Sequence, residues 1–269
     1  AVSTSGERFA TALATFGLVA LGTALQRFGS LFVDQLWLDD IQQLDAARRG
    51  LPADPLIEQP SLTSRPYWMA HFWMLRNVQS VVVIRLIYVA AYGAAALLAH
   101  HLLAKAVSAR TALAVVVASF LNPGTLLVFV FINGSSAVLS LLGVLVGLCC
   151  LVELFRSPTA SYRTWLMQAA FGASCLGVVM VSSNGVLTLA AFALLPWWRA
   201  PLRTDRRGFL VHVAASLACV IGSIGLGVAG ILGAHPYSRI PGRVVDGPLE
   251  ALANLARLLS SIAIAYIDP

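Results

Sequence analysis

Seven apolar segments, each close to the length of a bilayer crossing, dominate this sequence. They cover residues 8–30, 79–104, 111–131, 136–155, 164–182, 185–199 and 209–233. A helix needs about 20 apolar residues to cross a bilayer. Only 11% of the 269 residues are charged, whereas a soluble domain carries roughly 25%, so too little charge remains to cover a water-facing surface. The sequence therefore predicts an all-α, polytopic membrane protein with seven spans, and 249–267 is either an eighth span or a segment that only enters the membrane.

Basic residues gather in every second loop between these segments. The three loops contain Lys105 and Arg110, then Arg156 and Arg163, then Arg199, Arg203, Arg206 and Arg207. Cytoplasmic loops are enriched in lysine and arginine, so these loops are predicted to face the cytoplasm of a multi-pass protein in the plasma (inner) membrane. The same pattern accounts for the net charge of +6 without a nucleic-acid partner.

The outer loop, residues 31–78, is the only sizeable region outside the predicted membrane segments. Its first part reads "FVDQLWLDDIQQLDAARRG" over 32–50. The apolar positions that share one helical face are Ile41, Leu44, Ala47 and Leu51. They predict a short helix over 41–49 that lies in the membrane interface. The stretch "SRPYWMAHFWMLRN" (64–77) predicts a second aromatic, amphipathic segment at headgroup level.

Two adjacent acids, Asp39 and Asp40, open the predicted interfacial helix. Asp40 fits a helix cap, because Gln43 follows three residues later as in a capping box. Asp39 lies outside that cap, so its carboxylate is left for another role. A partly desolvated carboxylate beside a like charge has a raised pKa, and such a group is a candidate general base for an attacking hydroxyl.

Three arginines on the predicted outer side are candidate phosphate ligands. Arg65 precedes a proline in the outer loop, Arg85 lies about two turns inside the second segment, and Arg239 lies in "HPYSRIPGR" after the seventh. Snorkelling to lipid headgroups is the alternative reading for such residues. A charge at the depth of Arg85 is costly and usually has a partner, and a guanidinium can bind a phosphate through two hydrogen bonds.

Other polar residues carry weaker signals. His71 and His235 are predicted on the outer side and Asn184 at the outer end of a helix. Interfacial polarity is the favoured explanation of the histidines, and capping or a turn is that of Asn184. The histidines show no converging metal-ligand pattern, so no metal site is predicted, although a divalent cation stays open as a cofactor. The four cysteines, Cys149, Cys150, Cys175 and Cys219, lie in apolar segments and are predicted to be small core residues.

The order of these features resembles that of the polytopic GT-C glycosyltransferases, which include protein O-mannosyltransferases and bacterial lipid-linked sugar transferases. The matching features are the acidic pair, "SRPYWMAHFWML", "AAALLAHHLLAK", "SFLNPGTLL" and "SSNGVLTLAAFALLPWW", and they cover residues 8–200. One departure is clear. Where relatives have Lys-Glu after the serine, this chain has Asn184 and Gly185, so a charged contact is missing.

The resemblance implies a function. A sugar would pass, with inversion, from a polyprenyl-phosphate-linked donor to an acceptor hydroxyl on a glycan, lipid or protein at the outer face. Asp39 and Asp40 match the family's acidic pair, and Arg239 matches the arginine that holds the donor phosphate. Residues 1–269 would form one transmembrane module, and the ending "IAYIDP" suggests the N-terminal part of a longer chain.

Two other classes of function remain open at this stage. A transporter or flippase for a lipid-linked saccharide would carry charges near the middle of the membrane and inverted repeats; the sequence shows no repeat. A non-catalytic membrane subunit that kept the GT-C scaffold would explain the missing Lys-Glu.

Overall fold

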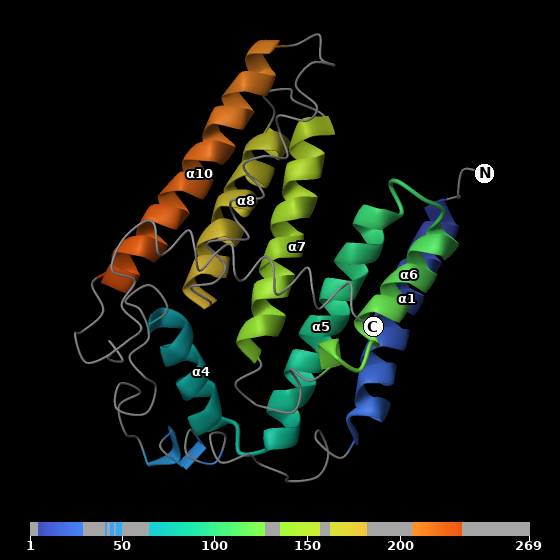
Figure 1. Ribbon diagram of the computed structural model, residues 1–269, viewed down its shortest axis with the longest axis vertical. Coiled ribbons are helices and arrows are strands. Elements are labelled where there is room, and N and C mark those ends of the chain that lie inside the picture. The colour runs from blue at the N-terminus through green and yellow to red at the C-terminus, as the bar shows by residue number, and fades with distance from the viewer. Residues whose placement is uncertain are drawn as a thin grey trace, which may run out of the picture. The chain divides into compact units, whose positions relative to one another are not determined.

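The computed structural model describes residues 5–28, 41, 44–45, 47–49, 65–126, 135–156, 162–181 and 206–232, and every regular element in these ranges is helical. The helices are α1 (Ser5–Gln26), α4 (Arg65–Asn77), α5 (Val81–Leu103), α6 (Ala109–Phe120), α7 (Ser135–Arg156), α8 (Tyr162–Val181) and α10 (Arg206–Leu232) (Figure 1). All belong to the first of two compact units, Ala1–Gly233; the second, Ala234–Pro269, lies outside the described residues.

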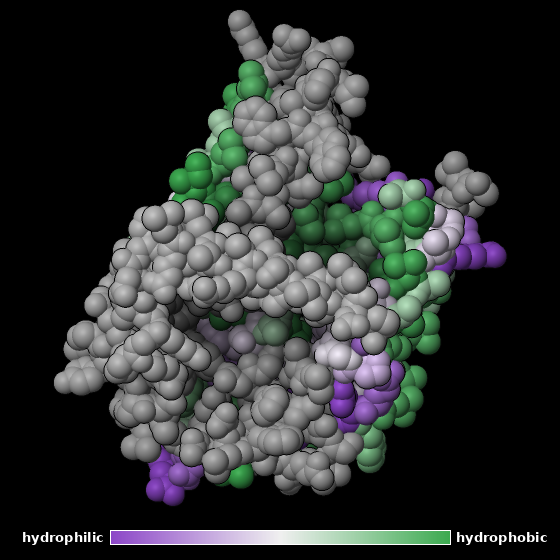
Figure 2. Space-filling model, in the orientation of Figure 1, coloured by the Kyte–Doolittle hydropathy of each residue, from purple (hydrophilic) through white to green (hydrophobic). Residues whose placement is uncertain are grey.

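Five of these helices are long and apolar enough to cross a membrane. The candidate spans are Ser5–Gln26, Val81–Leu103, Ser136–Leu154, Tyr162–Val181 and Leu210–Gly227, and each coincides with a predicted apolar segment. Their surfaces expose large aliphatic side chains, such as Leu21 (59%) and Ile221 (65%). Figure 2 shows hydrophobic surface along α10 and α1, and hydrophilic surface near the N-terminal end of α1. Because bilayer hydrocarbon covers such surface without cost, the chain is a multi-pass membrane protein, and the part that the structure describes is all-α.

The other three predicted membrane segments are not among these five candidate spans. α6 has only 12 residues and ends at Phe120, before Pro123. The sequence predicted a span over 111–131 that is interrupted at this proline, and residues 127–131 lie outside the described residues. Proline cannot continue the hydrogen-bond ladder of a helix interior, which explains the early end. The segments 185–199 and 249–267 lie outside the described residues.

Contacts between helices fix their relative directions. Gln168 of α8 hydrogen-bonds Ser216 of α10 at 3.3 Å, and Trp165 contacts His212 with ring centroids 5.5 Å apart. The residue numbers of the paired positions increase in the same direction along both helices, so α8 and α10 are parallel. Residues 182–205 therefore join opposite ends of this pair, which for the 20-residue α8 are about 30 Å apart.

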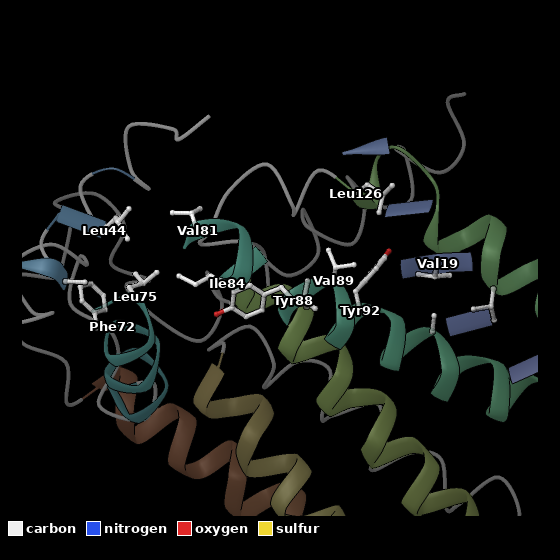
Figure 3. Packing of buried hydrophobic residues seen from close by; sticks show 14 residues of the cluster. Val19, Leu44, Phe72, Leu75, Val81, Ile84, Tyr88, Val89, Tyr92 and Leu126 are labelled. Atoms are coloured by element: carbon white, nitrogen blue, oxygen red, sulfur yellow. The ribbon is translucent and has the colours of Figure 1, made fainter. Parts of the chain in front are cut away.

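Two clusters of buried side chains hold the helices together. The first joins α1, α4 and α5 through residues such as Val19, Leu75 and Ile84 (Figure 3). The second joins α7, α8 and α10 and includes Leu151 and Phe171. It also contains Cys150 and Cys175, and the partly buried Cys219 packs against it, as predicted for small core residues. Cys149 is partly exposed, and all four cysteines are free thiols.

Close approach of α7 and α8 depends on Gly143. A Cβ atom there would lie 2.8 Å from Cγ2 of Val178, and the Ser174 hydroxyl donates a hydrogen bond to the Gly143 carbonyl. Small residues let membrane helices pack closely in this way.

We expect Gly143→Ala to destabilise the protein by about 1–3 kcal/mol, because the β-branched Val178 has little freedom to move away. The measurement is the thermal midpoint of the detergent-solubilised protein. Gly177→Ala is the matched control, since a Cβ on this α8 glycine meets nothing within 4 Å. Equal midpoints for the two variants would contradict the packing argument.

Serine caps fix the starts of α5 and α6. The Ser80 side chain accepts a hydrogen bond from the Val83 amide at 3.4 Å, and Ser108 accepts one from the Thr111 amide at 3.1 Å. Each cap satisfies an amide that has no partner within its helix. With α5 starting at Val81, Arg85 lies only just over one turn from the helix start, nearer to it than the sequence predicted.

Candidate functional site

The described residues contain only part of the predicted site. Asp39, Asp40, Asn184, His235 and Arg239 lie outside them. Arg65 is the first residue of α4. The described part of the candidate site therefore consists of Arg85, His71 and their neighbours.

Arg85 is a buried cation inside a candidate span. Its residue is only 3% exposed, and it lies on α5 three positions before Tyr88, so the two side chains share one face of the helix. A guanidinium does not lose its charge at neutral pH. The fold therefore keeps a positive charge in a place where ionic interactions are strengthened by the low dielectric.

His71 of α4 meets this face of α5. Its Nδ1 and the Tyr88 hydroxyl are joined by a hydrogen bond of 3.1 Å, and the Tyr67 ring stacks on the imidazole with ring centroids 5.8 Å apart. Figure 3 shows the Tyr88 hydroxyl pointing toward the side of the cluster where Phe72 and Leu75 of α4 lie. We call His71, Arg85 and Tyr88 the α4–α5 polar cluster.

Burial decides the charge of the cluster. His71 is 2% exposed, and desolvation lowers its pKa from 6.5 to about 4. The imidazole is therefore neutral at pH 7 and offers one nitrogen as a donor and the other as an acceptor. Within the cluster, Arg85 alone carries charge at this pH.

We expect the stability of the protein to fall as pH drops from about 6.5 to about 4. In this window the imidazole of the unfolded chain takes up a proton that the buried imidazole cannot accept, and the shift corresponds to about 3 kcal/mol. Above pH 6.5 this contribution is fully present. The measurement is the thermal midpoint against pH for the parent and for His71→Gln, which has no titrating ring; a slope of the same size in both would contradict the assignment.

A cavity of about 360 Å³ lies further along the same face of α5. It is lined by Tyr92, Ser119, Phe120, Thr125, Ala137, Val138 and Leu141. The Tyr92 hydroxyl donates a hydrogen bond to the Phe120 carbonyl at 2.9 Å. The lining is almost entirely apolar, and the cavity lies where α6 ends and α7 begins. It offers room for hydrocarbon one turn beyond the polar cluster.

The sequence reasoning missed Tyr88 and Tyr92, although a signal was present. Arg85, Tyr88 and Tyr92 recur at i, i+3 and i+7 in "RLIYVAAY", the spacing of one helical face. The partner of Tyr88 carried no such signal, because the contact with His71 depends on how α4 packs against α5.

Comparisons of the chain with protein-family models, curated proteins and solved structures return no match. Within the residues that the structure describes, no three potential metal ligands come together.

Proposed function

We propose that this chain is a GT-C-type membrane glycosyltransferase that moves a sugar from a polyprenyl-phosphate-linked donor to an acceptor hydroxyl. The observation that carries the proposal is the buried Arg85 near the start of α5. It shares a helical face with Tyr88, to which the neutral His71 hydrogen-bonds. A fixed guanidinium of this kind suits the phosphate of a lipid whose chain lies against the helices. The apolar cavity beside Tyr92 supports it further, since such a donor needs both a phosphate site and a hydrocarbon site.

The chemistry needs one base and one phosphate site. Asp39, with Asp40 beside it, would take the proton of the acceptor hydroxyl as its oxygen bonds to the anomeric carbon. The bond from that carbon to the phosphate oxygen breaks, and the electron pair leaves with the polyprenyl phosphate. Arg85, together with Arg65 and Arg239, would hold the phosphate more tightly as its charge grows, which lowers the barrier. A single displacement inverts the anomeric centre, as in inverting glycosidases.

The proposal includes a topology: the chain crosses the membrane seven or eight times, and its active site faces the outer side. The parallel arrangement of α8 and α10 supports a further crossing at 185–199, because residues 182–205 join opposite ends of the pair. The end where α5 stops and α6, α8 and α10 start carries Lys105, Arg110, Arg163 and Arg206. By the positive-inside rule this end is cytoplasmic, and the α4–α5 polar cluster then lies at the outer end.

Transport is the competing function that a specific observation favours. A buried charge such as Arg85 is also a common feature of transporters. The Asn184–Gly185 departure, by contrast, fits a non-catalytic subunit. A flippase for a lipid-linked saccharide would use the same phosphate site without breaking a bond.

The test is sugar transfer in membranes that contain the full-length protein and a pool of radiolabelled polyprenyl-phosphate sugar. A transferase moves the label from the donor to a glycan, lipid or protein that chromatography separates from the donor. A flippase or a non-catalytic subunit leaves all the label on the donor, and that result would overturn the proposal.

A further inference from the structure

A second cavity, of about 490 Å³, lies between α1, α5, α7 and α8. It is found where α1 and α8 begin and α5 and α7 end. His101, on its wall, is roughly 24 Å along α5 from Arg85, so this cavity is separate from the α4–α5 polar cluster. Its volume falls within the range of about 300–1,000 Å³ that is typical of small-molecule sites.

The wall of this cavity is mainly hydrocarbon and is open to the surface of α1. Ala12, Leu97 and Met167 are among the lining side chains. Two further lining residues, Phe9 and Leu13, are 73% and 58% exposed, so the wall continues into the lipid-facing surface of the helix. A cavity with few polar partners does not hold ordered water well, whereas an acyl chain from the bilayer can enter it from the side.

The charges at the mouth of the cavity favour an anionic headgroup. Two acids at this end are neutralised: Glu7 pairs with Arg110 at 3.0 Å, and Glu153, on the cavity wall, pairs with Lys105. Arg8 also lines the cavity and is exposed. Arg163 is exposed one helical turn before Met167, so it lies on the face of α8 that carries this lining residue. With both acids paired, the net charge at the mouth of the cavity is positive among the described residues.

We propose that this cavity binds one acyl chain of an anionic phospholipid, whose phosphate is held by Arg8 and Arg163. The site supplies both parts that such a lipid needs: a hydrocarbon-lined cavity between helices and exposed guanidinium groups at its mouth. The lipid comes from the leaflet at the end of the bundle where α1 begins. The proposal does not depend on the glycosyltransferase activity, because it concerns the opposite end of α5.

Native mass spectrometry of the purified full chain, titrated with phosphatidylglycerol or phosphatidylcholine, tests this site. We expect one tightly bound phosphatidylglycerol, preferred at least about fivefold over phosphatidylcholine, and a loss of about fivefold in that preference for Arg8→Gln, since one basic residue near a membrane surface contributes about that factor. Ala12→Phe fills the cavity and should abolish the tight binding. Ala10→Phe, at an exposed position on the same helix and outside the lining, should not.

Each outcome decides the proposal. Equal binding of the two lipids by the parent would overturn it, and so would tight phosphatidylglycerol binding by Ala12→Phe at an unchanged thermal midpoint. If Ala12→Phe fails to fold, Arg8→Gln carries the test, because a change at this exposed position leaves the packing intact. An unchanged lipid preference in that variant would then reject the site.

Discussion

Asp39→Asn is expected to lower the rate of sugar transfer by about 100- to 10,000-fold, the contribution of a general base. An amide has nearly the shape of a carboxylate but cannot take the proton of the acceptor hydroxyl. The measurement is the initial rate of label transfer in membranes, at saturating donor, with the amount of folded protein checked by size-exclusion chromatography in detergent.

Two neighbouring substitutions give this experiment its controls. Asp40→Asn preserves the predicted helix cap, since asparagine and aspartate cap equally well, so a loss with this variant reports a role in the chemistry. Asp45→Asn removes an exposed acid of the same loop, whose ion pair with Arg49 spans 2.9 Å; exposed pairs contribute little, so transfer should be unchanged. If Asp39→Asn and Asp40→Asn both keep full activity, neither acid takes part in the reaction, and the proposed mechanism has no base.

Arg85→Lys is expected to reduce kcat/KM for the lipid-linked donor by about 10- to 100-fold. Lysine preserves the charge but not the planar fork that binds a phosphate through two hydrogen bonds. Because Arg85 is only 3% exposed, solvent cannot replace the lost contact. The measurement is the dependence of transfer rate on donor concentration in lipid nanodiscs.

The matched substitution is Arg76→Lys, at an exposed arginine of α4 that snorkelling explains. We expect this control to keep the parent's kcat/KM. A loss in Arg85→Lys no larger than in the control would show that Arg85 compensates charge within the helices and does not bind the donor.

The helices could be predicted from sequence because membrane crossing imposes a length and an apolar composition on each segment. The start of α5 also follows from local chemistry, since Ser80 caps it. The end of α6 did not follow from hydropathy, because the apolar run continues past the point where Pro123 prevents further helix.

The candidate site was less accessible to sequence reasoning. Arg85 was identified because a charge in an apolar segment is visible in the sequence itself. The neutral state of His71 could not be predicted, since it results from burial between α4 and α5. The bond to Tyr88 likewise depends on tertiary packing, and the acids at 39 and 40, which lie outside the described residues, remain predictions.

The most direct test of the proposed activity uses purified full-length protein in nanodiscs and a polyprenyl-phosphate sugar labelled separately on the sugar and on the phosphate. With a lysate-derived acceptor fraction present, a transferase separates the two labels: the sugar label appears on the acceptor, and the phosphate label stays on the polyprenyl lipid. We predict this separation for the parent protein and its loss in Asp39→Asn. If the two labels stay together at every acceptor concentration while the donor still binds, the carbon–oxygen bond to phosphate is never broken, and the chain is not a glycosyltransferase.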